Sequence, residues 1–282
     1  MIDPVIFTIR LFGLELAFRW YGLLIGVAIL VGGLITEREM NRRGGKGEML
    51  WDLLLWVVPA GIVGARLYYV LNDIAGGGQY FLEDWRRTFY ITQGGLHIYG
   101  ALVLGLVAVY FYSKKHPLSM WMFLDSIAPA LLIGQAAGRP ANFINQELYG
   151  PPTDLPWGIP IAADHRLGPW RDLAAFPEET TRFHPTFAYE MIWNVITGSL
   201  ILWLSRKYPE KFKPGAAFFL WMVFAGLGRF LIEAFRPDQP LIPGTAVSWS
   251  RLVAGLLAIS GGVLLAVRMG KLKSGLSLPE KY

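Results

Sequence analysis

Six amide and charged side chains crowd into residues 134–150, GQAAGRPANFINQELYG, directly after the apolar run SIAPALLI. Four of them recur at spacings of four, three and four: Gln135, Arg139, Asn142 and Gln146. In a helix that spacing places all four on one face. A cation costs roughly 2.5 to 3.5 kcal/mol near the centre of a bilayer and less toward its surface, so it needs a partner or a function. The pattern therefore favours a polar stripe that points into the protein.

Pro140 indicates where this helix breaks. Proline has no backbone N–H, which leaves the carbonyl of Ala136 without its helical partner, and it biases Arg139 away from helical dihedrals. Non-helical backbone at membrane depth occurs only inside protein or along a water-filled cavity. A broken helix that carries a guanidinium thus predicts a cavity that receives an anion. The alternative is an interfacial arginine whose side chain extends to water, with the neighbouring amides capping the helix end.

A second charged stripe occurs in GLGRFLIEAFRPD at residues 226–238. Arg229, Glu233 and Arg236 are spaced by four and three, so they share a helical face. A simple ion pair is the alternative, but one glutamate cannot balance two arginines. Arg139 and Arg229, on two helix ends, would form a clamp for a phosphate group, because guanidinium donates in pairs to phosphate oxygens.

Histidine and tyrosine mark the starts of two more apolar runs. In TQGGLHIYGA, His97 could act as a general base and Tyr99 as a hydrogen-bond donor or base, although a single histidine is more often structural. In FHPTFAYE, His184, Tyr189 and Glu190 surround a proline that suits the first turn of a helix, so capping is the alternative role there.

The composition is that of a polytopic membrane protein, since the 282 residues are 54% hydrophobic and 17% charged, with a mean hydropathy of +0.39. The absence of cysteine excludes disulfides, thiolate metal sites and a cysteine nucleophile. The net charge of +5 comes from basic residues in a few short loops, so we expect no nucleic-acid partner. The sequence has no GxSxG, HExxH, Walker or GxGxxG motif and no carboxylate array for magnesium, so we expect no metal and no cofactor.

The apolar runs predict an all-α integral membrane fold with seven transmembrane helices. They lie at about residues 19–36, 51–71, 95–113, 120–138, 186–204, 215–233 and 248–268. Lysine and arginine concentrate after the first, third, fifth and seventh runs, which predicts a cytoplasmic C-terminus and an N-terminus outside. We expect no cleavable signal peptide, because no basic segment and no small-residue cleavage site precede the first run.

Residues 1–282 are expected to form a single polytopic membrane domain with one insertion. Residues 150–185, rich in Pro, Asp, Glu and Trp, are too many for a plain connection and predict a small irregular extracytoplasmic subdomain over the polar stripe. Arg66 follows two overlapping pairs of small residues that indicate a close helix contact. Its role is either support of the site or anchoring at the membrane interface.

Seven motifs, in order along nearly the whole chain, make it similar to the prolipoprotein diacylglyceryl transferases, multi-pass enzymes of the bacterial cytoplasmic (inner) membrane. GRPANFINQELYG closely resembles the signature of that family. The other motifs are DPVIF, RWYG, GARLYYV, GGLHIYG, HPTFAYE and GRFLIEAFRPD. The resemblance implies transfer of a diacylglyceryl group from phosphatidylglycerol, a membrane lipid, to the thiol of the lipobox cysteine in a prolipoprotein signal peptide. A thioether forms and glycerol phosphate leaves, and we expect the enzyme to be a monomer.

The resemblance also implies roles for individual residues, matched position by position to the family motifs. The implied catalytic residues are Arg139, Arg229, Tyr99 and Glu147. The implied phosphatidylglycerol-binding residues are Arg139, Asn142, Arg229, Tyr21 and Gly150. The implied supporting residues are Glu233, Arg66, His97, His184, Tyr189 and Glu190.

Two positions depart from the family pattern. Many members carry a histidine, proposed as the base, where this chain has Tyr99, and a tyrosine where it has Ala225. In a helix, His97 and Tyr99 would point about 200° apart, so we expect that His97 does not replace the family histidine. The base is then either Tyr99 or a group elsewhere.

Two other functions fit the arginines. A phospholipid or anionic-solute transporter would also place arginines on broken helices, but it would move its ligand without covalent change. The third possibility is a lipid-binding or assembly protein without catalysis. A chemically modified substrate would distinguish the enzyme from both.

Overall fold

The computed structural model describes residues 2–11, 14–91, 94–116, 119–236, 239–273 and 281–282. Pro237 and Asp238, which close the second arginine motif, lie outside this range. Seven long helices form the bundle: α1 (Trp20–Arg42), α2 (Met49–Ala75), α4 (Ile98–Lys115), α5 (Met120–Gly138), α7 (Thr186–Lys207), α8 (Ala216–Ile232) and α9 (Trp249–Arg268). Two short helices, α3 (Tyr80–Glu83) and α6 (Pro140–Ile144), lie in the connections.

The helical prediction is confirmed, and six helices in the described part of the chain are long and apolar enough to cross a membrane. They are α1, α2, α5 continued through α6, α7, α8 with its last turn, and α9. The predicted run at 95–113 corresponds to α4, which packs along α2. A feature that we did not predict is a hairpin of two strands, β1 (Val5–Leu11) and β2 (Leu14–Arg19), ahead of α1.

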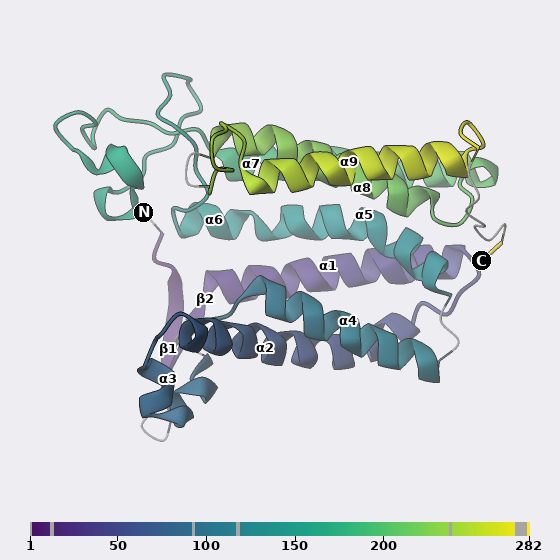
Figure 1. The fold of residues 1–282 in the computed structure, drawn as a ribbon, viewed down its shortest axis with the longest axis horizontal. Helices are drawn as coiled ribbons and strands as arrows, with labels where there is room; N and C mark the ends of the chain where they lie inside the picture. Colours follow the sequence, from purple (N-terminus) through teal and green to yellow (C-terminus); the bar gives the residue numbers. More distant parts are fainter. Residues whose placement is uncertain (1, 12–13, 92–93, 117–118, 237–238, 274–280) are drawn as a thin grey trace.

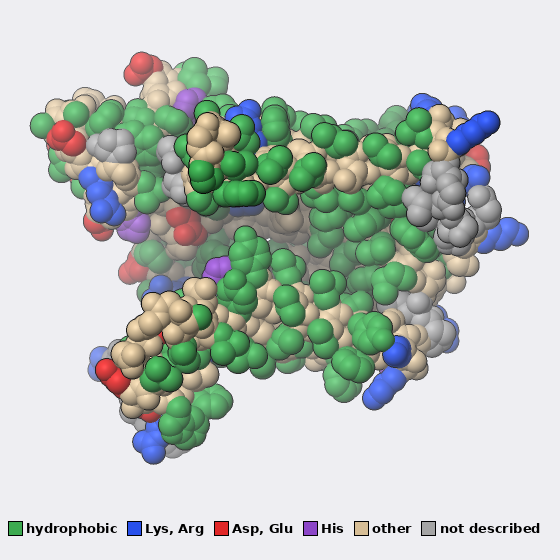
Figure 2. All heavy atoms as spheres, viewed as in Figure 1, with side chains coloured by type: hydrophobic (Ala, Val, Ile, Leu, Met, Phe, Trp, Pro, Cys, Tyr) green, Lys and Arg blue, Asp and Glu red, His purple; other side chains and the backbone are tan. Residues whose placement is uncertain are grey.

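Successive long helices run in opposite directions, so the connections gather at two ends of the bundle (Figure 1). The hairpin, α3, α6 and residues 150–185 lie at one end, which we call the head end. Lysine and arginine side chains gather at the opposite end, which we call the basic end (Figure 2). The functional motifs at the end of α5, the start of α7 and the end of α8 all lie at the head end.

The long helices form two groups. α2 packs so closely against α4 that a Cβ on Gly100 would lie only 2.0 Å from the carbonyl oxygen of Gly64. In the other group, α1 packs on α5, α5 contacts α7 and α8, and α8 lies along α9. Close approach through glycine suits helices in lipid, where apolar side chains gain nothing by leaving the hydrocarbon.

At the basic end, an apolar cluster joins the two groups, and a charged cluster lies beside it within the second group. The apolar cluster comprises Met40, Leu50, Leu53, Tyr112 and Phe123. Beside it, the fully buried carboxylate of Glu39 pairs with Arg42 at 2.7 Å and with Arg206 at 2.8 Å. These pairs connect the ends of α1 and α7 over 167 residues of sequence.

Residues 150–185 are irregular but packed. Tyr149, Ile161, Trp170 and Phe183 form a small apolar core there. The side chain of Arg166 is buried among them, donates to the carbonyls of Ile161 and Phe176 at 2.9 and 2.6 Å, and lies over the ring of Phe183. The contacts of Arg166 hold residues 150–185 together.

Candidate functional site

Arg139 lies at the junction of α5 and α6. α5 ends at Gly138 and Pro140 is the first residue of α6, so the helix is interrupted where the proline predicts. Arg139 itself has helical dihedrals, φ −62° and ψ −30°, so the expected shift away from them is wrong. The bias that proline exerts is small enough to be overcome here, because the Arg139 carbonyl accepts a bond from the N–H of Asn142 at 3.0 Å and its side chain is held by α7.

The Arg139 guanidinium forms an ion pair with Glu190 of α7 and donates to the side-chain oxygen of Asn142 at 3.4 Å. Both members of the ion pair are largely buried, with 18% of the Arg139 side chain and 13% of the Glu190 side chain exposed. Arg229, Arg236 and Tyr21 lie close enough to interact with Arg139 electrostatically. The two arginine motifs therefore lie within electrostatic range of each other, and the phosphate clamp stays a prediction.

Asn142 connects Arg139 to Glu147. Its side-chain N–H donates to the Glu147 carboxylate at 2.9 Å, and Asn145 donates to the same oxygen at 3.4 Å. The backbone around this carboxylate is unusual, since Gln146 and Leu148 have positive φ angles of 52° and 54°. Such conformations are strained for residues other than glycine and concentrate at functional sites. Glu147 is thus held at the surface by two amides.

Arg229 of α8 pairs with Glu233 one turn later, at 3.2 Å. Glu233 is 5% exposed, and its other oxygen accepts a bond from the hydroxyl of Ser248 at 2.9 Å. Ser248 also caps the first turn of α9 through the N–H of Arg251. The carboxylate that orients Arg229 is therefore fixed from both sides.

His184 and Tyr189 form a further polar contact at the start of α7. The Tyr189 hydroxyl lies 3.0 Å from Nδ1 of His184 and accepts a bond from the indole of Trp157 at 2.8 Å. Gly150 lies beside them, where a Cβ would come within 3.0 Å of Thr186, His184 and the carbonyl of Phe235. The geometry gives Gly150 a packing role between segments, in addition to any contact with lipid.

His97 and Tyr99 lie near one another, contrary to the expected 200° separation. α4 begins at Ile98 and His97 is its N-cap in an extended conformation, so helical spacing does not apply. The two rings are 5.0 Å apart, and the ring of Tyr68 lies 4.7 Å from His97. Tyr99 is exposed and His97 is partly buried.

The side chain of Arg66 binds backbone carbonyl groups. Its guanidinium donates to the carbonyls of Arg87, Thr88, Gly94 and Gly95 at 2.6 to 3.0 Å. The side chain is buried, and it holds the connection between α2 and α4 against the end of α2. These bonds favour the supporting role for Arg66.

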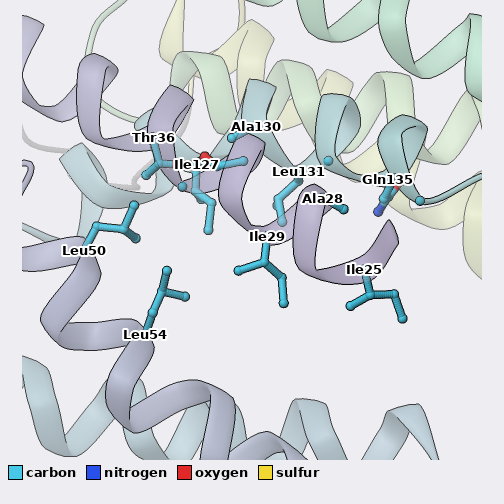
Figure 3. A pocket seen from close by; sticks show the side chains of 14 residues that line it. Ile25, Ala28, Ile29, Thr36, Leu50, Leu54, Ile127, Ala130, Leu131 and Gln135 are labelled. Carbon is cyan, nitrogen blue, oxygen red and sulfur yellow. Dashed lines mark hydrogen bonds between the residues drawn. The ribbon is translucent and has the colours of Figure 1, made fainter. Parts of the chain in front are cut away.

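An apolar cavity of about 380 Å³ lies between α1, α2 and α5. In Figure 3, side chains from α1, α2 and α5 point into it, among them Ile29, Leu54 and Leu131. Gln135 lies at one end of the cavity and Thr36 at the other. Its lining includes Gly138, the residue before Arg139. Because the other side chains of the lining are apolar, the cavity suits the hydrocarbon part of a lipid.

Sequence reasoning missed two residues that hold the site. Ser248 bonds Glu233 from 15 residues away, and Trp157 bonds Tyr189 from 32 residues away. Ser248 could have been found as the helix-capping serine of SWSR. Trp157 lies in an irregular segment and has no local pattern that predicts its partner.

Comparison with known proteins extends the motif resemblance to most of the chain. Residues 4–267 match the family "Prolipoprotein diacylglyceryl transferase". A phosphatidylglycerol–prolipoprotein diacylglyceryl transferase of Chloroflexus aggregans is 36% identical over 276 residues, covering 93% of this chain and 89% of that protein. Proteins of the same name from Thermosynechococcus vestitus and Halalkalibacterium halodurans are 39% and 38% identical, covering 88% and 87% of this chain and 88% and 80% of their own lengths. The chain therefore belongs to the prolipoprotein diacylglyceryl transferase family.

Proposed function

We propose that this chain transfers a diacylglyceryl group from phosphatidylglycerol to the cysteine thiol of a prolipoprotein. The observation that carries the proposal is an apolar cavity between α1, α2 and α5 whose lining extends to Gly138, the residue before Arg139, with Arg229 within electrostatic range of Arg139. The guanidiniums suit the phosphate of the lipid, and the cavity suits its hydrocarbon. Relatives named for this reaction cover nearly the whole chain.

In the proposed step, the sulfur of the peptide attacks the glycerol carbon that carries the phosphate ester. A carbon–sulfur bond forms, the carbon–oxygen bond breaks, and its electron pair leaves with glycerol phosphate. The thiol proton goes to a base, for which Tyr99, with His97 5.0 Å away, is our candidate. Arg139 and Arg229 stabilise the negative charge that grows on the leaving phosphate, which is an electrostatic contribution.

The proposal also specifies the membrane that the protein spans and the orientation of the protein in it. Lysine and arginine follow α1, α4, α7 and α9 at the basic end, so the positive-inside rule puts that end and the C-terminus in the cytoplasm. α4 serves as a seventh span, and residues 150–185 form a subdomain outside the cytoplasmic membrane of a bacterium. The proposal also takes the enzyme to act as a monomer.

The test is a reaction with purified components. The protein in detergent is incubated with phosphatidylglycerol and a synthetic lipobox peptide with one cysteine, and mass spectrometry detects a diacylglyceryl adduct on that cysteine. We expect the adduct with the wild-type protein and not with Arg139→Ala. Arg86→Ala is the matched control, because Arg86 is an exposed head-end arginine outside the cluster. If the folded wild-type protein binds phosphatidylglycerol but yields no adduct, the enzyme assignment is refuted. A transporter or a non-catalytic binding protein then becomes the preferred function.

A further inference from the structure

A cavity that the proposed reaction does not use lies between α2 and α4 at the basic end. Its volume is about 320 Å³, and we call it the basic-end pocket. The residues that line it are Trp56, Ala108, Phe111, Tyr112, Lys115 and His116. The walls are thus aromatic and aliphatic, with a cation at the last residue of α4. A pocket of this composition suits an amphiphile with a hydrocarbon part and an anionic group.

The basic-end pocket extends from the ends of two antiparallel helices into the bundle. α2 begins at Met49 and α4 ends at Lys115, both at the basic end (Figure 1). Trp56 and Ala108 each lie seven residues from these ends. At a helical rise of 1.5 Å per residue, that places them at a depth of about 10 Å. One leaflet of the hydrocarbon core is roughly 15 Å thick, so the pocket lies at the depth of the acyl-chain segment next to a lipid headgroup.

Lys115 supplies a positive charge that the protein leaves available. Within the part of the chain that the structure describes, its exposed side chain forms no ion pair and no hydrogen bond. Asp52 of α2 lies within electrostatic range of Tyr112, but it is not paired with Lys115. The neighbouring Lys114 lies 4.7 Å from the ring centre of Tyr110, outside the pocket. Lysine and arginine also gather over this end of the molecule (Figure 2), and such a surface attracts anionic lipid.

Tyr112 connects the basic-end pocket to the packing of the bundle. It is 5% exposed, belongs to the apolar cluster that joins the two groups of helices, and donates its hydroxyl to the carbonyl of Met49 at 3.2 Å. The ring of His116 stacks on it at 4.2 Å. Trp56 and Phe111, in contrast, are 63% and 59% exposed. A chain that fills the pocket would cover these two rings and contact both helices.

We propose that the basic-end pocket binds an anionic phospholipid of the leaflet at that end, which the proposed orientation makes the cytoplasmic one. One acyl chain lies against Trp56 and Phe111, and the headgroup phosphate lies at Lys115. Because this lipid binds the folded protein, it stabilises the packing of α2 against α4. The site is at the opposite end of the bundle from Arg139, and the lipid in it is a structural ligand. The inference does not depend on the transferase reaction.

The test measures which lipid lies beside Trp56. The full-length protein is placed in phosphatidylcholine nanodiscs that contain an equal fraction of either phosphatidylserine or phosphatidylcholine with brominated chains, which quench tryptophan fluorescence on contact. The Trp56 signal is the difference between the wild type and Trp56→Phe. We expect brominated phosphatidylserine to bind about fivefold more tightly than brominated phosphatidylcholine, the factor expected for one lysine near the membrane surface. Lys115→Gln should bring this ratio near one, as should Ala108→Phe, which fills the pocket.

The matched controls separate the pocket from general surface charge and from the site at the head end. Lys114→Gln removes the same charge one residue away and should keep the fivefold ratio, and so should Arg139→Gln. Phosphatidylserine should raise the Tm of the wild type in nanodiscs more than that of Lys115→Gln, while the two proteins melt alike in phosphatidylcholine alone. Equal quenching by both brominated lipids, or equal effects of Lys114→Gln and Lys115→Gln, would overturn the inference. Either result would leave the transferase function standing, because that function is tested by adduct formation.

Discussion

The ion pair between Arg139 and Glu190 allows stability and catalysis to be measured separately. Arg139→Gln leaves the Glu190 carboxylate, 13% exposed, without its partner. Removing one member of a buried pair costs about 3–5 kcal/mol. Because both side chains are partly exposed, 18% for Arg139 and 13% for Glu190, we expect the lower part of this range, about 3 kcal/mol. Glu190→Gln, added to Arg139→Gln, removes the unpaired charge and should restore most of the free energy of unfolding.

We expect the added Glu190→Gln substitution to restore the stability of Arg139→Gln but not its activity. If Arg139 stabilises the leaving phosphate, both Arg139→Gln and the double variant should lose about 10²–10³ in kcat, the cost of removing one such donor. Unfolding in detergent titrated with denaturant gives the stabilities, and mass-spectrometric adduct formation gives kcat. A double variant that regains both stability and wild-type activity would refute the catalytic role of Arg139, because its contribution would then be structural.

Three further perturbations test other parts of the structure. Gly100→Val would put side-chain atoms against the backbone of α2 and should lower the free energy of unfolding by about 1–3 kcal/mol, measured in the same titration. Arg66→Lys replaces a planar fork by a point charge that cannot reach four carbonyls, so we expect faster proteolysis in residues 84–95 with the bundle intact. Tyr99→Phe should lower kcat about 10²-fold or more, as expected on loss of a general base, and His97→Gln much less; the reverse order in adduct assays would transfer the role to His97.

Helix positions could be predicted because the signal is local. The predicted run at 51–71 corresponds to α2, Met49–Ala75, and the predicted run at 248–268 corresponds to α9, Trp249–Arg268. The hairpin was not predicted although alternation is visible in its first strand, where Thr8 and Arg10 alternate with Phe7, Ile9 and Leu11. In the structure, Phe7 pairs with Phe18 and their rings stack 4.6 Å apart. Near a first membrane span, a period of two is easily hidden by high overall hydropathy.

The site could be predicted only in part, for a physical reason. Arg139 stood out because a guanidinium in an apolar run demands compensation, and Arg229 because its spacing to Glu233 is helical. The pairing of Arg139 with Glu190 depends on how α5 packs against α7, which no local pattern contains. The predicted 200° separation of His97 and Tyr99 was wrong because helical geometry does not apply to His97, which precedes the first residue of α4.

The carboxylates beside the two arginines have a consequence for the proposed reaction. Glu190 and Glu233 keep Arg139 and Arg229 oriented, yet they also compete with any anion that approaches. A phosphodiester carries one negative charge, so its attraction to guanidiniums that are already paired is modest. As the carbon–oxygen bond breaks, the leaving phosphate gains charge and attracts the same guanidiniums more strongly, while the carboxylates do not change. The same positive potential therefore acts on a larger charge in the transition state than in the bound lipid, and only that difference accelerates the reaction.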